Sequence, residues 1–295
     1  GTLAVRGGAV TGNRSYGDYG GGGGALSSVG PVDISGTVLQ GNEANGIFSP
    51  GGAALLRGGG RIADAHVSGN RTTETDSPGG AILASGPMTL VDTRLDTNLT
   101  EGPGSPGGAI SASLDAGGLV IHGGAIERNG TRGDYSAGGA IRSQESVVLV
   151  GTFLQANTTT GSSSSGGAIS SGDSVTAINA SFLENGTAGA LSHGGAIQAP
   201  IRVALQNSTV TGNTVAGPGA SGGAAATQVV VDVANSLVIG NTALQGAAGL
   251  EVFSAGGIGG PGGPFVAFSA PALVGAGPGE FVADATSAII ASGRD

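Results

Sequence analysis

Residues 88–112 read MTLVDTRLDTNLTEGPGSPGGAISA and carry a motif that recurs along the chain. Asn98 lies near the middle of this stretch, and a glycine pair, Gly107 and Gly108, begins nine residues later. The asparagine returns every 28 residues, with one interval of 31, as Asn42, Asn70, Asn98, Asn129, Asn157, Asn185, Asn213 and Asn241. The first seven are each followed by a glycine pair and an alanine, the pairs being Gly51 and Gly52, Gly79 and Gly80, Gly107 and Gly108, Gly138 and Gly139, Gly166 and Gly167, Gly194 and Gly195, and Gly222 and Gly223. A fixed period of this length predicts one structural unit stacked on copies of itself.

The apolar residues before each asparagine have the spacing of short strands. Met88, Leu90 and Leu95 lie ten, eight and three positions before Asn98, and the same offsets return in later repeats. Residues two apart share one face of a strand, and the gap of five predicts a bend between two strands. The residue six positions before each asparagine is of a turn-forming type, as Gly36, Asp64, Asp92, Gly123, Gly151, Asn179, Asn207 and Asn235.

A third strand is expected to begin at each glycine pair. The isoleucines that follow share one phase of the repeat: Ile82, Ile110, Ile141, Ile169 and Ile197. The next position is mostly polar, as in Ser111 and Arg142, and is expected to face outward. The polar stretch between asparagine and glycine pair, such as 99–106, is expected to be a loop. These patterns predict an all-β solenoid of three parallel sheets with about ten coils, roughly 48 Å long at the spacing of paired strands.

The recurring asparagines and glycines have a structural interpretation. Asparagines in successive coils would lie roughly 4.8 Å apart, where each side-chain amide can donate to the carbonyl oxygen of the next. A glycine pair suits a bend at which a side chain would obstruct the neighbouring backbone. We therefore predict a structural asparagine ladder and structural glycine turns, since catalytic residues would not need to recur in every coil.

The repeat predicts one elongated domain over residues 1–295. Residues 21–250 carry the regular repeat, and 251–295 are expected to form divergent coils with a loop rich in Gly and Pro at 254–264. The three extra residues of the long interval are expected after Ile110, in the connection to the next strand.

Composition excludes several classes of partner. The net charge is −9, and all eleven basic residues are Arg, which disfavours nucleic acid and docking on anionic lipid. There is no Cys, so thiolate metal sites and disulfides are excluded. No apolar run approaches the roughly 20 residues of a membrane span. The sequence indicates no cofactor and no transmembrane segment.

A polysaccharide lyase or hydrolase is the main enzymatic alternative, because parallel β-helices also host such enzymes. Its candidate carboxylates are Asp64 with Asp92 and Asp96 with Glu127, each pair sharing one phase in adjacent coils. The structural alternative is that the first pair replaces the bend asparagine of later coils and that the second pair is solvent-exposed. His66, His122 and His193 occupy different phases and predict no shared metal. The absence of Lys and Trp weakens the enzymatic interpretation.

Two short motifs resemble the repeats of the chlamydial polymorphic outer membrane proteins. Phe182-Leu183-Glu184-Asn185 matches their Phe-x-x-Asn element, and Gly194-Gly195-Ala196-Ile197 matches their Gly-Gly-Ala-Ile element. Elsewhere Leu, Val or Ile stands in place of Phe, and the resemblance covers about 21–250. It implies a right-handed parallel β-helix that is exported to the bacterial cell surface and often serves in adhesion.

From these observations we expect a non-enzymatic, extracellular or cell-surface β-solenoid that presents a contact surface to a protein or glycan partner. The polysaccharide enzyme is the second hypothesis. A third is a subunit that associates end to end into an extracellular filament, since strands in phase with the repeat occur near both ends of the sequence.

Overall fold

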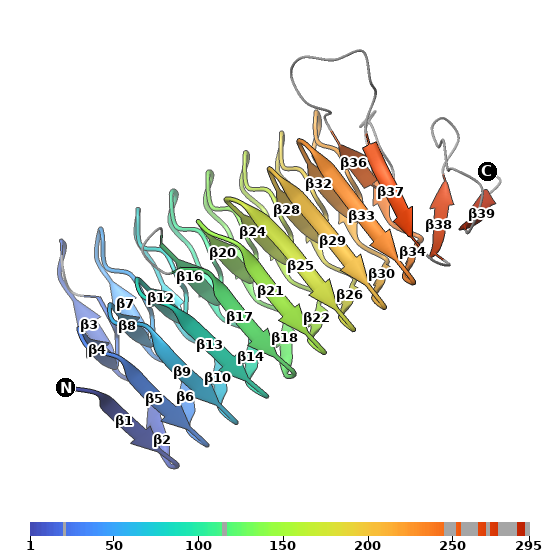
Figure 1. Ribbon diagram of the computed structural model, residues 1–295. Helices are drawn as coiled ribbons and strands as arrows, with labels where there is room; N and C mark the ends of the chain where they lie inside the picture. The colour runs from blue at the N-terminus through green and yellow to red at the C-terminus, as the bar shows by residue number, and fades with distance from the viewer. Residues whose placement is uncertain are drawn as a thin grey trace.

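The chain folds into an all-β parallel solenoid with about eight regular turns of about 28 residues. The computed structural model describes residues 1–19, 22–113 and 117–244, together with the backbone of four later strands within 252–292. The described residues contain strands and their connections but no helix, and every strand pairs in parallel with its counterpart in at least one neighbouring coil. Figure 1 shows the coils as a stack that runs from blue to orange. The predicted solenoid is confirmed, with about eight regular coils in place of about ten.

Each coil contributes to four sheets rather than to the three that the sequence predicted. Sheet A contains β1 Leu3–Arg6, β5 Val32–Ser35, β9 Gly60–Ala63, β13 Met88–Val91, β17 Leu119–His122, β21 Val147–Val150, β25 Ser174–Ile178, β29 Arg202–Gln206, β33 Val230–Ala234 and β37 Phe265–Ser269. Sheet B contains β2 Ala9–Thr11, β6 Val38–Gln40, β10 His66–Ser68, β14 Arg94–Asp96, β18 Ala125–Glu127, β22 Phe153–Gln155, β26 Ser181–Leu183, β30 Thr209–Thr211, β34 Leu237–Ile239, β38 Ala272–Ala276 and β39 Ala288–Ser292.

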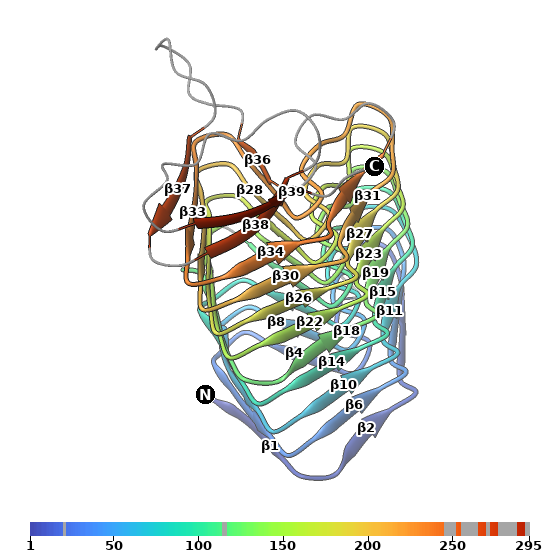
Figure 2. The same cartoon turned by 90° about the vertical axis from the view of Figure 1, so that its right-hand side faces the viewer.

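The two remaining sheets follow the asparagine and the glycine pair. Sheet C contains β3 Arg14–Tyr16, β7 Glu43–Asn45, β11 Arg71–Thr72, β15 Leu99–Thr100, β19 Gly130–Thr131, β23 Thr158–Thr159, β27 Gly186–Thr187, β31 Thr214–Val215 and β35 Thr242–Ala243. Sheet D contains β4 Leu26–Ser28, β8 Ala54–Leu56, β12 Ile82–Ala84, β16 Ile110–Ala112, β20 Ile141–Ser143, β24 Ile169–Ser171, β28 Ile197–Ala199, β32 Ala225–Thr227 and β36 Val252–Ser254. In Figure 2 the strands of sheet C lie in one column at a corner of the coil.

Sheet C is the correction to the predicted fold. The loop expected over 99–106 begins with a two-residue strand, in which Leu99 pairs with Gly130 and Thr100 with Thr131. Two residues are too few to show a periodic pattern, and the threonine that recurs there is polar although it is buried. The strand forms because coils stacked in parallel pair their backbones wherever consecutive chains run side by side.

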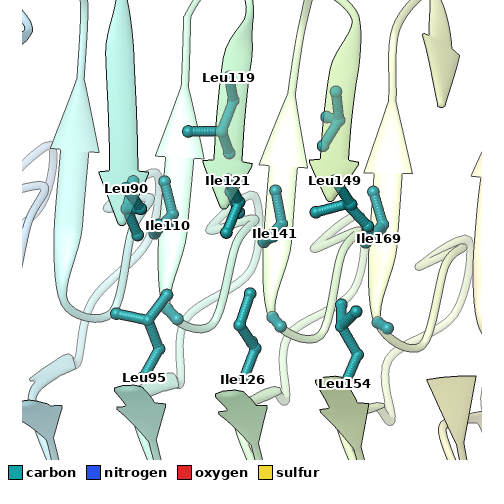
Figure 3. Close-up of a cluster of buried hydrophobic side chains, with 14 of the residues drawn as sticks. Leu90, Leu95, Ile110, Leu119, Ile121, Ile126, Ile141, Leu149, Leu154 and Ile169 are labelled. Carbon is teal, nitrogen blue, oxygen red and sulfur yellow. The ribbon is translucent and has the colours of Figure 1, made fainter. Parts of the chain in front are cut away.

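The core is a stack of aliphatic layers. The residues ten, eight and three positions before the asparagine are buried, as in Met88, Leu90 and Leu95. Ile110 and Ile141 close the core from sheet D, and both are 0% exposed. Figure 3 shows how leucines and isoleucines from three sheets meet in successive coils. The predicted phase of these residues is therefore confirmed.

The predicted bends are also confirmed. All eight residues at the position six before the asparagine have positive φ, including Asp64 at 49° and Asp92 at 44°. The extra residues of the long interval lie between Ala112 and Leu119, because Ala84 and Met88 are the register partners of these two residues in the preceding coil. This place in the chain agrees with the prediction.

Neighbouring side chains cover part of the sheet D position that was expected to face outward. Ser111 and Ser170, which stand at this position, are 6% and 1% exposed. Ser170 is covered because its hydroxyl group bonds Arg142 on one side and Gln198 on the other. In the last described coils, Leu237 pairs with Leu273 and Val238 with Val274. The loop predicted at 254–264 lies, apart from Ser254, outside the described residues.

Candidate functional site

The eight recurring asparagines form one buried row through the solenoid. Each is 0–3% exposed. In the middle of the row, the Asn157 Oδ1 atom accepts bonds from the backbone N–H and the side-chain Nδ2 of Asn129, both at 3.0 Å. Asn157 Nδ2 in turn donates to Ile126 O at 2.8 Å and to Asn185 Oδ1 at 2.9 Å. The same set of bonds is repeated from Asn42 to Asn213, and Asn13 donates to Asn42 at the start of the row.

The two glycines of each pair have different roles. The first has φ between 70° and 75° in all seven coils, a backbone region that glycine enters without strain. The second has no side chain because the next coil is too close: a Cβ on Gly139 would lie 2.1 Å from Gly167 O and 2.5 Å from Thr158 O. The glycine pair therefore sets both the turn and the tight stacking of coils.

Two further polar rows lie inside the structure, and the sequence reasoning missed them. A serine seven positions after the asparagine accepts the backbone N–H of the corresponding serine in the preceding coil, as Ser164 Oγ does from Ser136 at 2.9 Å. A threonine two positions after the asparagine donates to the carbonyl oxygen of that serine, as Thr131 does to Ser136. The serines are Ser49, Ser77, Ser105, Ser136, Ser164 and Ser192, and the threonines are Thr72, Thr100, Thr131, Thr159 and Thr187. Their 28-residue recurrence was the signal that could have revealed them.

In the coil of Asn213 both the threonine and the serine positions hold apolar residues. Val215 stands where the coils from Asn70 to Asn185 have threonine, and Ala220 stands where they have serine. Both side chains are buried and contact Ala243 of the next coil in a small apolar cluster. The acceptor of the threonine hydroxyl is a backbone carbonyl oxygen, so replacing serine with alanine does not remove it.

The carboxylates considered for catalysis fall into two structural groups. Asp64 and Asp92 lie in adjacent coils at an exposed bend and have left-handed backbones. Asp96 and Glu127 are register partners on sheet B and are each engaged by arginine. Arg94 Nη2 lies 2.8 Å from Glu127, and Arg128 Nη2 lies 2.9 Å from Asp96. The first pair thus occupies the bend position of the later asparagines, and the second pair belongs to an ion-paired cluster on the outer face.

One carboxylate is buried, and two arginines hold it. Glu43 is 6% exposed and accepts bonds from Arg71 Nη2 at 2.9 Å and Nε at 3.1 Å, with Arg14 Nε 3.4 Å away. Burial raises the pKa of Glu43, but the hydrogen bonds and charge of Arg71, helped by Asn45 and Arg14, outweigh it and leave the pKa below its usual range. Glu43 therefore joins three successive coils at sheet C.

The histidines do not form a site. His66 lies on sheet B, His122 ends β17 on sheet A, and His193 lies in the turn before a glycine pair. His193 Nδ1 is 2.8 Å from Ser221 Oγ, and burial lowers the pKa of its imidazole. Across the part of the chain that the structure describes, no three His, Asp or Glu residues are grouped so that they could hold a metal ion.

The turns after sheet C form a rim along one edge of the solenoid. We call residues four to six positions after Asn13, and after each asparagine from Asn42 to Asn213, the edge turns: 17–19, 46–48, 74–76, 102–104, 133–135, 161–163, 189–191 and 217–219. The third residue of each turn has φ between 53° and 70°. From Tyr19 to Leu191, its N–H donates to the carbonyl oxygen of the middle residue in the next turn at 2.8–3.1 Å. One turn of each coil projects at the same edge in Figure 1, and the hydrogen bonds fix these turns relative to one another.

A comparison with protein-family models, curated proteins and solved structures finds no match to this chain. Among the described residues, no helix is long and apolar enough to cross a membrane. The residues and their geometry are therefore the basis on which function is inferred.

Proposed function

We propose that this chain is a non-enzymatic, extracellular or cell-surface scaffold whose edge turns and outer faces present a contact surface. The observation that carries the proposal is the division between constant and variable residues. The asparagine, serine and glycine rows are occupied by bonds and contacts within the fold. The edge turns share one backbone, yet their last residues range from tyrosine and aspartate to glycine. A rigid backbone whose side chains differ from turn to turn suits recognition, because the turns lose little conformational entropy on binding.

The location rests on the resemblance of the Phe-x-x-Asn and Gly-Gly-Ala-Ile elements to those of the chlamydial surface proteins. An adhesive role, with a protein or glycan as partner, follows from the same resemblance. Surface labelling of cells that make the full-length protein would test it: labelling only after cell lysis would contradict a surface location. End-to-end filament formation stays a prediction, for which electron microscopy of the purified chain is the direct test.

The enzymatic alternative has a direct test. We expect no release of new reducing ends or unsaturated products when the protein is incubated with a panel of acidic and neutral polysaccharides. Asp64→Ala and Asp92→Ala serve as the matched variants, because among the four candidate carboxylates these two are exposed and not paired with arginine. Turnover that either substitution abolishes would reverse the proposal in favour of a polysaccharide lyase or hydrolase.

A further inference from the structure

Four bulky apolar or aromatic side chains lie exposed at the last position of the edge turns. Tyr19 is 76% exposed, Phe48 46%, Tyr135 73% and Leu191 57%. The rings of Tyr19 and Phe48 stack with their centroids 5.3 Å apart. These side chains contribute little to the core, yet each occupies a left-handed backbone conformation. That conformation costs about 1–2 kcal/mol for a residue with a Cβ.

Glycine is compatible with the same position. Gly104 and Gly219 occupy it in two other coils with φ of 64° and 70°. The edge turn thus forms without a side chain at its tip, so turn formation does not require the rings. Large exposed aromatic side chains at a strained position point instead to contact with another molecule.

The charge of the edge turns indicates what kind of molecule would bind them. The edge turns contain four carboxylates, Asp18, Glu74, Asp76 and Asp134, and no arginine. None of these four is in an ion pair within the described part of the chain, whereas Arg14 and Arg132 nearby are held by Glu43 and Glu101. Asp18 and Asp134 use one oxygen each to accept a backbone N–H of the next coil, from Ile47 and Ser162. The rim therefore combines uncompensated negative charge with exposed ring faces.

We infer that the edge turns from 17–19 to 133–135 bind a basic polypeptide segment, one that presents arginine or lysine side chains; this rests on the proposed scaffold function. Guanidinium and ammonium groups pair with carboxylates and lie over aromatic rings, so one partner group satisfies both features of the rim. A second copy of this chain fits poorly, because two acidic rims would repel each other.

The sequence Gly-Asp-Tyr occurs at 17–19 and again at 133–135, in corresponding turns four coils apart. At the spacing of paired strands this separation is roughly 19 Å, which an extended segment of about six residues spans. Hydrogen bonds between successive turns hold both copies in place. A short basic segment lying along the rim can therefore contact both copies at once.

Fluorescence anisotropy with labelled nona-arginine tests the inference, with labelled cellohexaose as the glycan probe. We expect nona-arginine to bind at low salt and to weaken as salt is raised. Tyr19→Asn combined with Tyr135→Asn should weaken binding about tenfold or more. Asn tolerates a left-handed backbone, so this variant keeps the turn. Asp18→Asn combined with Asp134→Asn should also weaken binding, while the amide oxygen still accepts the N–H of the next coil.

Two control variants isolate the rim from general charge effects. Asp64→Asn combined with Asp92→Asn removes the same number of charges at a bend outside the edge turns. Gly219→Asn places asparagine at the corresponding turn position, outside the proposed binding stretch. Both should bind nona-arginine as the unmodified protein does. Absence of binding, equal effects of the rim and control variants, or binding of cellohexaose alone would each overturn the inference. These outcomes leave the scaffold proposal standing, because that proposal is tested separately by surface labelling and by polysaccharide turnover.

Discussion

Each asparagine from Asn42 to Asn213 has its side-chain donors and acceptor occupied by partners in the coils on either side. Asn157 accepts two bonds and donates two, so its side chain joins three successive coils. Aspartate would lack the two donors, and a row of buried charges roughly 4.8 Å apart would repel. The side-chain chemistry therefore explains why this residue recurs while the apolar positions vary.

Replacing Asn157 with alanine should lower the free energy of unfolding by about 1–3 kcal/mol. The change leaves the backbone N–H and Nδ2 of Asn129 without their acceptor and Ile126 O without its donor. Urea unfolding followed by circular dichroism measures the effect. Asn179→Gly is the matched control, because Asn179 is exposed and has a φ of 52° that glycine adopts freely. A loss for Asn157→Ala no larger than that of the control would contradict a stabilising row.

The residue before each asparagine gives a second prediction, in which two substitutions change the free energy of unfolding in opposite directions. This residue is left-handed in every coil, including Ala156 at 53° and Gly41 at 61°. Ala156→Gly should raise the free energy of unfolding by about 1 kcal/mol, and Gly41→Ala should lower it by a similar amount. A Cβ on Gly41 meets no atom within 4 Å, so the backbone alone sets the effect. Thermal unfolding of both variants in parallel checks the signs, and two shifts in the same direction would refute the argument.

Among the elements, the strands with apolar periodicity were predictable and sheet C was not. Met88, Leu90 and Leu95 revealed β13 and β14 because alternate positions face the core. β15 has two residues, and one of them, Thr100, is a buried polar residue whose hydroxyl group donates to Ser105 O. In sheet C the stacking of coils, and not the strand propensity of the residues, determines the structure. A strand of two residues has no periodic pattern that could be recognised in the sequence. The edge turns lie within the predicted loops, but the correspondence of their aromatic residues was missed: Tyr19 and Tyr135 lie 116 positions apart and come into corresponding turns only once the register is known.

At sheet C, Glu43 predicts how stability depends on pH. Its pKa lies below the usual value in the folded state, so its contribution is present above that usual value and is lost as pH falls through the lowered one. As pH falls from the usual titration range of glutamate through the lowered pKa of Glu43, the unmodified protein should therefore lose stability more steeply than Glu43→Gln. Urea unfolding across this range measures the slope. Glu74→Gln, which removes an exposed carboxylate outside any ion pair, should retain the steep acid limb. If Glu43→Gln retains it as well, Arg71 and Arg14 do not provide the stabilisation.

At the scale of the whole molecule, the sequence revealed the fold because the same residues repeat, and it revealed function poorly for the same reason. Repeated residues such as Asn157 and Gly139 indicate the structural requirements that all coils share. Function depends on residues that differ between coils, such as Tyr135, and a repeat gives no signal for them. In a solenoid each coil contacts only its neighbours, so stability is a sum of coil and interface contributions. A local defect should consequently remain local.

Gly139→Ala tests that locality. Its Cβ would lie 2.1 Å from Gly167 O and 2.5 Å from Thr158 O, both backbone atoms, so the coils must move apart at a cost of more than about 2 kcal/mol. Gly151→Ala is the control, because a Cβ there meets no atom within 4 Å. Hydrogen exchange followed by mass spectrometry should show lost protection in β20 and β24, with β5 and β9 unchanged. Equal loss of protection in all four strands would mean that the solenoid unfolds as one cooperative unit, and the nearest-neighbour description would then be wrong.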